Sequence, residues 1–376
     1  MQDAGQPGRI VLAIRDLEIG GAEGQVAALA GGLHRRGWQV HVAALFGNGP
    51  HQAVLENEGI DVFRARFRDP RRVAVRRRPA AVLSLPIGLA GYARWLRRVR
   101  PDVVHAFLYQ AYVPTAFAAR LARVPSVVTA RRNLGGYKRG RRFALLVERA
   151  ANACTDLVVA NSEAVAERTL EDEGLPAEKV MVIPNGVPER FFEIPELANR
   201  AGPPRIVCVA NLRPPKGHGD LLEAAAMLVR DQVAFQLVLA GDGPCREELE
   251  LRARQLAVPA EFLGSQRDIA AVLADADIVV SASREEGFSN SIIEAMAASR
   301  PVVATSVGGN SEALGDTGVL VPPGDPAAMH RELLTLLQDP ERRRALGARA
   351  RSRAATQFSL QRMISTHAEL YARLTA

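Results

Sequence analysis

The chain has 376 residues, of which 48% are hydrophobic and 24% are charged, and its formal net charge is +7. These values are typical of a soluble globular protein with two domains of ordinary size. They exclude a membrane-spanning protein, because the longest weakly polar run, residues 80–93, contains proline and glycine and is too short to cross a bilayer.

The first elements are typical of a doubly wound α/β domain. Residues 9–14 have a buried-strand pattern, a turn with Gly20 and Gly21 follows, and residues 25–33 have helical periodicity. Glycines let the backbone approach a ligand at the carboxyl edge of such a sheet. No apolar signal segment precedes the strand. The cysteines form neither a disulfide framework nor a zinc cluster, so we expect a cytoplasmic protein: Cys154, Cys208 and Cys245.

A basic field follows the next expected strand, residues 39–45. Between Arg64 and Arg100 lie twelve arginines and a single acidic residue, Asp69. Such a field attracts anionic lipid head groups or an acidic acceptor. Nucleic acid is not an expected partner, because aromatic interleaving and recognisable nucleic-acid motifs are missing. Residues 85–99 form an amphipathic basic helix, which either packs one face on the core or lies on a membrane surface.

Polar residues stand where two further strands of this domain end. The strands are expected at 102–106 and 126–130, and ligands bind at the carboxyl edge of such sheets. The first domain is predicted to cover residues 1–187, and the proline-containing segment 188–204 to be a linker. The polar residues are His105, Tyr109, Arg131, Arg132 and Asn133.

The second domain, residues 205–355, repeats the doubly wound pattern. Its first strand, 205–210, leads into a proline-stiffened turn that carries Arg213 and Lys216, a cation pair suited to phosphates. The next strand, 235–240, leads into a turn that begins at Gly241. Residues 356–376 are expected to form a helix that returns to the first domain.

The stretch from Ser281 to Thr305 reads as a strand end, a polar loop, a helix and a second strand. A polar loop feeding a helix N-terminus presents free N–H groups and a positive dipole end, which suits a phosphate. Glu286 in the loop and Glu294 in the helix could then bind hydroxyls on either side, as in a nucleotide sugar. Alternatively, Ser291-x-x-Glu294 is a capping box, and Glu294 only closes the helix.

These motifs, in this order, resemble the retaining glycosyltransferases of the large group-1 (family-4) type. Members of this family have the GT-B fold, in which two Rossmann-like domains face each other across a cleft. The resemblance covers nearly the whole chain: GGAE at 20–23, DVVH at 102–105, IPNGV at 183–187, NLRPPKG at 211–217, AGDGP at 240–244, EGFSNSIIEAMA at 286–297, PVVAT at 301–305 and GGNSE at 308–312.

The resemblance implies roles for the matching residues. Arg213 and Lys216 would neutralise the donor diphosphate, Glu294 would hold the ribose, and Glu286 the sugar hydroxyls. His105 would lie against the donor sugar, so the expected catalytic residues are His105, Arg213, Lys216 and Glu286. Further donor-binding groups are Gly20, Gly21, Gly241, Gly287, Phe288, Ser289, Asn290 and Ser291. The acceptor side is expected at Tyr109, Arg131, Arg132 and Asn133.

The implied reaction moves a sugar, with retention, from a nucleoside-diphosphate sugar (a UDP-sugar favoured) to a hydroxyl of a saccharide or polyprenyl-diphosphate-linked acceptor. The pathway would be the synthesis of lipopolysaccharide, another envelope component or an exported polysaccharide, with the enzyme peripheral at the inner face of the plasma membrane. Neither cofactor nor metal is expected. Asp275-Ala276-Asp277 matches the metal-binding DxD motif of a different glycosyltransferase fold, but it lies at a helix end and is interpreted as structural.

Two other functions stay open. A nucleotide-sugar-binding subunit without turnover would need the same fold, but the intact Arg213, Lys216, Glu286 and Glu294 argue against it. A nucleotide-sugar epimerase could also use this fold, but NLRPPKG and EGFSNSIIEAMA favour transfer over epimerisation. A dehydrogenase is disfavoured, because neither domain opens with a GxGxxG fingerprint.

Overall fold

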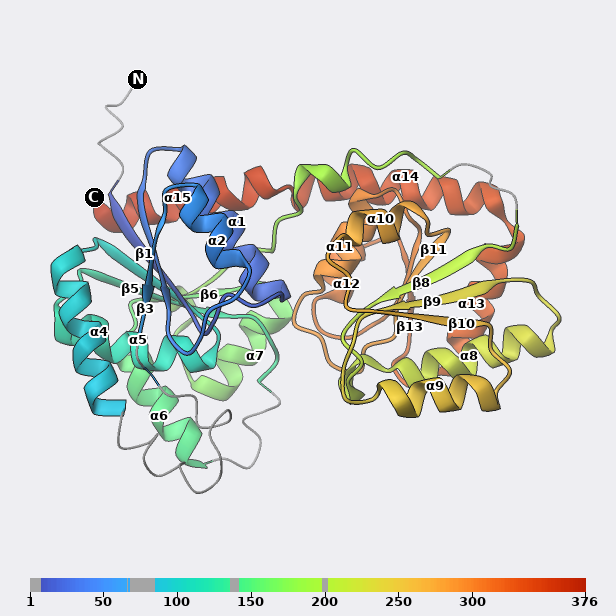
Figure 1. Cartoon of the computed structure of the whole chain (residues 1–376), viewed down its shortest axis with the longest axis horizontal. Coiled ribbons are helices and arrows are strands. Elements are labelled where there is room, and N and C mark those ends of the chain that lie inside the picture. Colours follow the sequence, from blue (N-terminus) through green and yellow to red (C-terminus); the bar gives the residue numbers. More distant parts are fainter. Residues whose placement is uncertain (1–7, 66, 68–84, 136–141, 198–201) are drawn as a thin grey trace. The chain divides into compact units, whose positions relative to one another are not determined.

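The computed structural model describes residues 8–65, 67, 85–135, 142–197 and 202–376. The chain forms two compact units (Figure 1). The first contains Met1–Gly186 and Gln361–Ala376, and the second contains Val187–Leu360. Each unit is built on its own parallel sheet with helices on both sides, so the predicted pair of doubly wound domains is confirmed.

The first sheet has seven strands, whose order reverses between the first and fourth strands of the chain. Near-continuous apolar runs such as RIVLAI form these strands because both faces are buried. In spatial order they are β3 (Asp61–Arg64), β2 (Gln39–Ala44), β1 (Arg9–Ile14), β4 (Val103–Phe107), β5 (Ser126–Arg131), β6 (Leu157–Ala160) and β7 (Val180–Val182). The helices are α1 (Gly21–Arg35), α2 (His51–Asn57), α4 (Leu85–Val99), α5 (Tyr109–Ala122), α6 (Arg142–Ala153), α7 (Glu163–Glu173) and α15 (Leu360–Thr375), with the 3₁₀ turn η3 (Ala177–Lys179).

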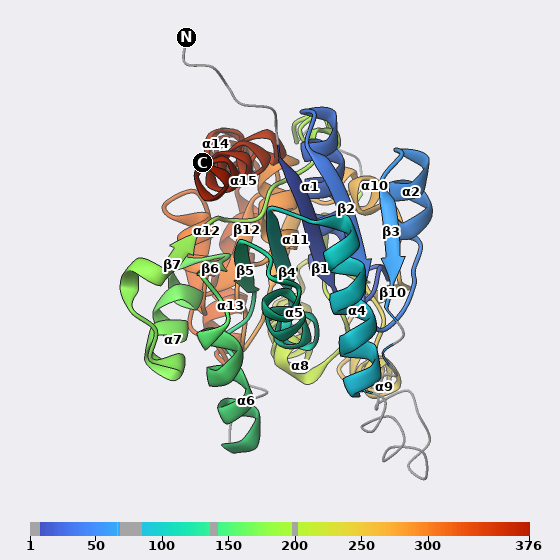
Figure 2. The same cartoon turned by 90° about the vertical axis from the view of Figure 1, so that its left-hand side faces the viewer.

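Strand β4 shows how the helices divide between the two faces of this sheet (Figure 2). Successive side chains of a strand point to opposite faces. Val104 and Ala106 belong to the apolar cluster that includes residues of α4 and α5. His105 lies on the other face, where its Nδ1 is 2.7 Å from the hydroxyl of Tyr371 on α15. Helix α15 therefore covers the face opposite α4 and α5.

Helix α4 packs its apolar side into the core of the first unit. Tyr92 and Leu96 are fully buried, and the ring of Trp95 stacks on Phe63 with centroids 4.2 Å apart. Most of the apolar face is thus used inside the protein, as an ordinary amphipathic helix would use it, whereas the arginines and Ile87 near the start of the helix are exposed. Seven of the twelve arginines of the expected basic field, at residues 66 and 68–84, lie outside the described residues.

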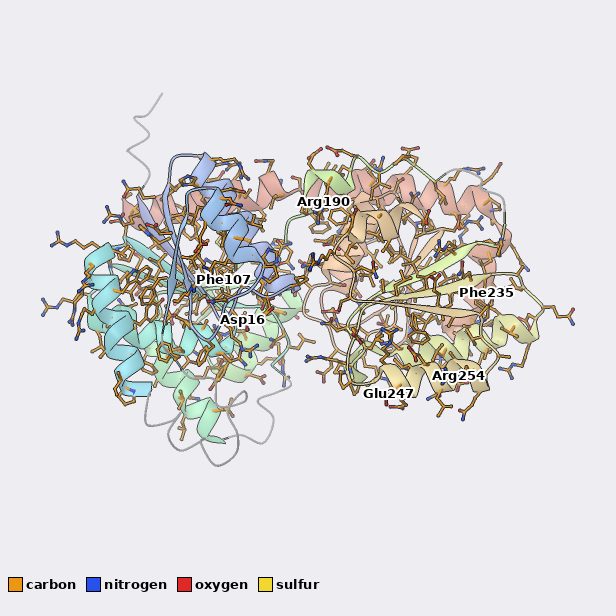
Figure 3. All side chains as sticks on the ribbon, viewed as in Figure 1. Asp16, Phe107, Arg190, Phe235, Glu247 and Arg254 are labelled. Atoms are coloured by element: carbon orange, nitrogen blue, oxygen red, sulfur yellow. The ribbon has the colours of Figure 1, made fainter. Side chains whose placement is uncertain are left out.

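The second sheet has six strands with the same reversal of order. In spatial order they are β10 (Ala260–Gly264), β9 (Gln236–Ala240), β8 (Arg205–Val209), β11 (Ile278–Ser281), β12 (Val302–Thr305) and β13 (Val319–Val321). Figure 3 marks Phe235, which is buried in the core of this unit just before β9. The helices are α8 (His218–Arg230), α9 (Arg246–Gln255), α10 (Ile269–Ala274), α11 (Asn290–Ala297), α12 (Asn310–Leu314), α13 (Pro326–Gln338) and α14 (Pro340–Gln357), with the 3₁₀ turns η4 (Glu189–Phe191) and η5 (Pro214–Lys216).

The two passages of the chain between the units are hydrogen-bonded to each other. The backbone N–H of Val187 donates to the carbonyl of Phe358 at 2.7 Å, and that of Leu360 donates to the carbonyl of Val187 at 3.0 Å. Phe191 and Ile194 are buried in the core of the second unit. The first part of the expected linker 188–204 therefore packs on the second unit because it supplies apolar side chains; residues 198–201 lie outside the described residues.

Within the part of the chain that the structure describes, no helix is both long enough and apolar enough to span a membrane.

Candidate functional site

The candidate donor site lies where the strand order of the second sheet reverses, between β8 and β11. Ligands bind at such a reversal in open α/β sheets. The turn after β8 and the loop after β11 are joined by a hydrogen bond from the N–H of Arg284 to the carbonyl of Pro215, 2.7 Å long. Gly217 has a φ of +66°, and a Cβ there would lie 1.8 Å from the carbonyl oxygen of Ala282. Only glycine permits this close approach of the two loops.

The two loops bring Lys216 and Glu286 into contact. The Lys216 Nζ lies 2.5 Å from the Glu286 Oε2, with 27% of the lysine side chain and 14% of the glutamate side chain exposed. Arg213, three residues before the lysine, is exposed, and its guanidinium has no ion pair or hydrogen bond within the described ranges. Among the described residues, Lys216 is thus paired with a carboxylate and Arg213 is not.

Helix α11 begins beside this pair, with Ser289 as its N-cap residue. Ser291 is the second residue of the helix, so the capping-box alternative for Ser291 and Glu294 is wrong. The hydroxyls of Ser289 and Ser291 are 3.0 Å apart. The N–H groups in the first turn of an α-helix have no carbonyl partner within the helix, so a helix start at this place in the sheet suits an anion.

Glu294 lies on the second turn of α11, and its carboxyl group makes no hydrogen bond or ion pair with any described residue. Burial raises the pKa of its carboxyl to about 7, against a smaller opposing effect of Arg190 on the neighbouring turn η4. Figure 3 marks Arg190, which the sequence analysis missed because it lies in the expected linker. A partly buried, uncommitted carboxylate is suited to accept hydrogen bonds from a diol.

The other predicted donor groups contribute through their backbone. The Phe288 side chain is buried against Phe358, with ring centroids 5.4 Å apart, so only its amide faces the loop. Gly287 accepts a hydrogen bond from the N–H of Gly309 at 2.9 Å. Gly241 has a φ of +152°, and a Cβ there would lie 2.0 Å from the carbonyl oxygen of Ala210. Close backbone contacts therefore hold the loops at this sheet edge together.

The DxD-like residues are structural, as predicted. The Oδ2 of Asp277 accepts a hydrogen bond from the backbone N–H of Arg205 at 2.8 Å. Asp275 forms an ion pair with the Arg205 guanidinium at 3.1 Å. Both carboxylates are thus used at the start of β8, the opposite end of the strand from the candidate donor site.

His105 does not occupy its predicted place. Strand β4 continues to Phe107, so His105 lies in the strand and is fully buried. Its Nδ1 contacts the hydroxyl of Tyr371, and its ring lies 5.7 Å from that of His367, both on α15. Burial holds the pKa of His105 well below its ordinary value, so the imidazole is neutral. The expected contact with a donor sugar is therefore corrected: α15 covers this side chain.

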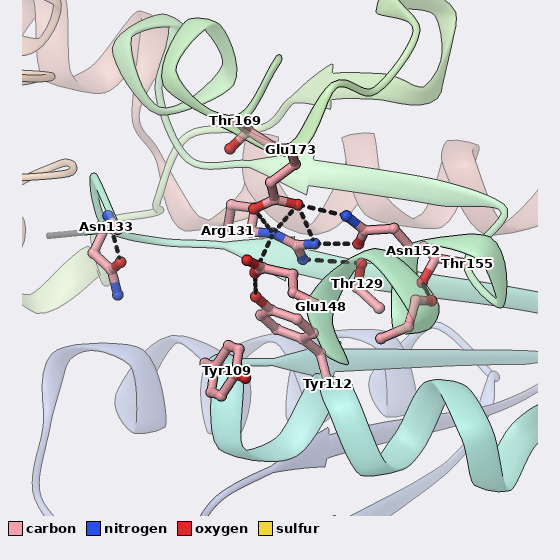
Figure 4. A network of polar contacts seen from close by, with 12 residues as sticks. Tyr109, Tyr112, Thr129, Arg131, Asn133, Glu148, Asn152, Thr155, Thr169 and Glu173 are labelled. Carbon is pink, nitrogen blue, oxygen red and sulfur yellow. Dashed lines mark hydrogen bonds and ion pairs between the residues drawn. The ribbon is translucent and has the colours of Figure 1, made fainter. Parts of the chain in front are cut away.

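Arg131 is also used internally (Figure 4). Its guanidinium lies 2.8 Å from Glu173 of α7 and 3.9 Å from the centroid of the Tyr112 ring, and it donates to Asn152 at 2.7 Å. Glu148 lies 4.0 Å away on α6. The side chain is only 4% exposed, so its predicted contact with an acceptor is corrected to a structural role.

The other predicted acceptor residues line a pocket above this network. Tyr109, Arg132 and Asn133 line it together with Thr169 and Asp172 of α7. The Tyr109 hydroxyl donates to the carbonyl of Ala144 at 3.3 Å, and Asn133 is exposed. Arg131, Arg168 and Glu173 line the same pocket, so aromatic, amide, cationic and carboxylate groups meet there.

The start of α1 holds a residue that sequence reasoning did not single out, Glu23. Its Oε2 lies 2.2 Å from the position that a Cβ on Gly20 would take, so the carboxyl group covers the turn formed by Gly20 and Gly21. Burial raises the pKa of Glu23. Arg132 lies nearby and hydrogen-bonds to Asn185, and burial lowers its pKa to about 10. The helix start expected to approach a phosphate is occupied by the protein's own carboxyl group.

Comparisons with known proteins identify both units. Residues 203–339 match the family model for glycosyl transferases group 1, and residues 19–191 match that for glycosyltransferase family 4. The putative glycosyltransferase EpsD of Bacillus subtilis is 30% identical over 359 residues, covering 89% of each chain. The N-acetyl-alpha-D-glucosaminyl L-malate synthase of Bacillus anthracis is 30% identical over 233 residues, 58% of this chain and 59% of that protein.

The fold is also found among solved structures. Anabaena HepE in complex with UDP and glucose superposes with a TM-score of 0.82 at 24% identity, covering 96% of this chain and 99% of that one. The sucrose-phosphate synthase of Thermosynechococcus elongatus gives a TM-score of 0.78 at 21% identity, covering 98% and 99% of the two chains. At these identities the likeness establishes the fold alone.

Proposed function

Since the chain belongs to the group 1 glycosyltransferases and has the GT-B fold, we propose that it transfers a sugar, with retention of configuration, from a nucleoside-diphosphate sugar to an acceptor hydroxyl. The observation that carries the proposal is the juxtaposition of Lys216, Glu286 and the start of α11 at the reversal of the second sheet. The Arg213 guanidinium and the Glu294 carboxyl group have no hydrogen bond or ion pair with another described residue.

The chemistry follows from these residue types. Sugar transfer builds negative charge on the leaving diphosphate while the sugar becomes oxocarbenium-like. Fixed cations and backbone N–H groups aimed at that charge stabilise the transition state, and one such donor is typically worth about 3 kcal/mol. Arg213, Lys216 and the first amides of α11 would serve the diphosphate, Glu294 the ribose diol and Glu286 the sugar hydroxyls. A diphosphate oxygen would take the proton of the attacking hydroxyl.

The donor is proposed to be a UDP-sugar, a choice supported by the UDP, glucose and UDP-glucose named with the HepE structures. The reaction is proposed to need no metal ion. The acceptor is proposed to be a saccharide, free or polyprenyl-diphosphate-linked, whose sugar would enter the pocket of Tyr109 and Asn133 in the first unit. Envelope or exported polysaccharide synthesis at the inner face of the plasma membrane is the corresponding pathway.

Calorimetric titration of UDP, GDP, ADP and their glucose conjugates in EDTA tests the donor site. We expect selective micromolar binding of one nucleotide by the wild type and its loss in Glu294→Ala. Undiminished binding in that variant would remove the ribose role of Glu294. If none of these ligands binds, the donor-site proposal is wrong.

Turnover separates the three candidate functions. A transferase releases the nucleoside diphosphate when an acceptor is supplied, and NMR of the product shows the retained anomeric configuration. A binding subunit would leave the donor intact, and an epimerase would change the sugar while it stays attached to the nucleotide. Equal turnover with EDTA and with added Mg²⁺ is the expected result for metal-independent transfer.

A further inference from the structure

The ion pair between Lys216 and Glu286 joins two residues that the donor would need separately. We propose that Glu286 is the internal counter-ion of Lys216, and that breaking this pair makes the site select the sugar-bearing donor over the nucleoside diphosphate product. This inference rests on the proposed function of the same site. It adds a specificity-determining role for Glu286 that its contact with sugar hydroxyls does not by itself include.

The pair is held in place by backbone. The N–H of Arg284 donates to the carbonyl of Pro215, and the close approach of Gly217 to Ala282 fixes the same two loops. The Arg284 guanidinium also binds both carboxylate oxygens of Asp220 at 2.8 and 2.9 Å. Separating Lys216 from Glu286 therefore needs only side-chain rotation within fixed loops.

A diphosphate and Glu286 compete for the same ammonium group. When the diphosphate takes Lys216, the Glu286 carboxylate loses its 2.5 Å partner and meets new negative charge nearby. Its remaining hydrogen-bond donor among the described residues is the Ser283 hydroxyl, 3.4 Å away. The glutamate side chain is only 14% exposed, so water replaces the lost partner incompletely.

The donor sugar replaces the hydrogen-bond donor that Glu286 loses when Lys216 binds the diphosphate. Hydroxyl groups of a donor sugar bring hydrogen-bond donors to the carboxylate, so Lys216 and Glu286 both regain partners. A nucleoside diphosphate brings none, and Glu286 stays poorly solvated beside the phosphates. Glu286 therefore favours the binding of the sugar-bearing donor and weakens the binding of the nucleoside diphosphate product. The weaker product binding favours product release after transfer.

Two neighbouring residues supply matched controls. Glu285 is exposed, so Glu285→Gln changes the net charge by the same amount without touching the ion pair. Arg213 is a cation without a carboxylate partner in the described structure. Arg213→Gln should weaken the binding of sugar-bearing and sugar-free nucleotides to a similar degree.

The test is calorimetric titration of Glu286→Gln, Glu285→Gln and wild type with UDP, GDP and ADP and with their glucose conjugates, in EDTA. For the nucleotide that the wild type binds, Glu286→Gln should bind the diphosphate about tenfold more tightly and its glucose conjugate no more tightly. The ratio of the two affinities then falls at least tenfold, while Glu285→Gln keeps it. Unchanged or weaker diphosphate binding by Glu286→Gln would overturn the counter-ion role.

A measurement without ligand tests the ion pair separately from nucleotide binding and shows whether a variant is simply misfolded. In a double-mutant cycle of thermal unfolding, Lys216→Gln and Glu286→Gln should each lower the midpoint, and the double variant should fall by less than the sum. Additive changes would overturn the ion pair in solution. If the wild type binds no nucleotide, the proposed function fails, whereas normal binding with an unchanged affinity ratio in Glu286→Gln defeats only this inference.

Discussion

Glu294 shows how the surroundings of one residue determine its properties. Its carboxyl group has no hydrogen-bonding partner in the described structure, and burial raises its pKa to about 7 from an ordinary value of 4.5. The unliganded protein therefore holds a proton that an unfolded chain would release. A bound diol would reverse this preference, because its hydroxyl groups donate to the ionised form.

The pH dependence of stability follows from that shift. Between pH 4.5 and about 7 the folded Glu294 stays protonated while the unfolded one ionises, so the wild type loses stability as the pH rises. The Glu294→Gln variant has no carboxyl group that can ionise at this position, so it does not lose stability in this way. Denaturant unfolding should show the variant gaining about 3 kcal/mol relative to wild type between pH 4.5 and 8. The unfolding free energies of Glu294→Gln and wild type could instead change with pH in parallel over this range, as expected for Glu285→Gln. That result would contradict the raised pKa of Glu294.

For single residues, the sequence predicted which loop each residue belongs to better than it predicted the surroundings of its side chain. Lys216, Glu286 and Glu294 were placed at one site because each follows the carboxyl end of a strand in a recognisable motif. His105 was misplaced because its partner, Tyr371 on α15, is 266 positions away, and no local pattern shows which face of β4 that helix covers. The role of Arg131 was missed because its carboxylate partner, Glu173, is 42 positions away on α7, and no local pattern pairs them.

Among the elements, α15 depends on one buried polar contact. The Tyr371 hydroxyl and the His105 Nδ1 satisfy each other beneath the helix, 2.7 Å apart. Tyr371→Phe would leave the imidazole nitrogen unpaired in the core, and we expect a loss of roughly 1–3 kcal/mol in unfolding free energy. Tyr109→Phe is the control, because its half-buried hydroxyl makes a 3.3 Å bond and its loss should cost less. Equal losses would show that the buried contact is not special.

The turn between β8 and α8 depends on a single glycine. Gly217→Ala would place a Cβ 1.8 Å from the Ala282 carbonyl oxygen at a φ of +66°. The two loops must separate, so we expect at least tenfold weaker nucleotide binding by calorimetry. Gly219→Ala is the matched control, since its Cβ would meet only Arg252 at 3.5 Å. Normal nucleotide binding by Gly217→Ala would mean that the loops tolerate separation.

The order of strands, glycine turns and helices was predictable at this scale because both sheets are built from apolar runs with glycine or polar residues after them. The boundary of the linker was not. Phe191 and Ile194 look like isolated apolar residues among prolines, and only the packed second unit shows that they belong to its core.

For the whole molecule, the positive charge is the property with a testable consequence. Tyr92 and Leu96 on the apolar side of α4 are buried in the core, so we expect membrane association to depend mainly on exposed arginines such as Arg94 and Arg98. The wild-type protein should sediment with anionic vesicles at low salt and dissociate from them as the salt concentration rises. Replacing both arginines with glutamine should lower the partition coefficient on the order of tenfold.

The control for this prediction lies in the second unit. Arg230 and Arg254 are exposed, and Arg254 is marked on α9 in Figure 3. Their replacement with glutamine removes the same charge from a different surface and should leave vesicle binding nearly unchanged. Equal binding of the wild type to neutral and anionic vesicles would remove the membrane role altogether.

The chain order of the first unit has a consequence for synthesis. Residues 361–376, which cover the His105 face of the first sheet, follow the entire second unit in the chain. At a translation rate of roughly 5–20 residues per second, the nascent first sheet waits on the order of ten seconds for this helix. During that interval an apolar face is exposed on the ribosome. The unit that is translated first is therefore completed only after the one translated second.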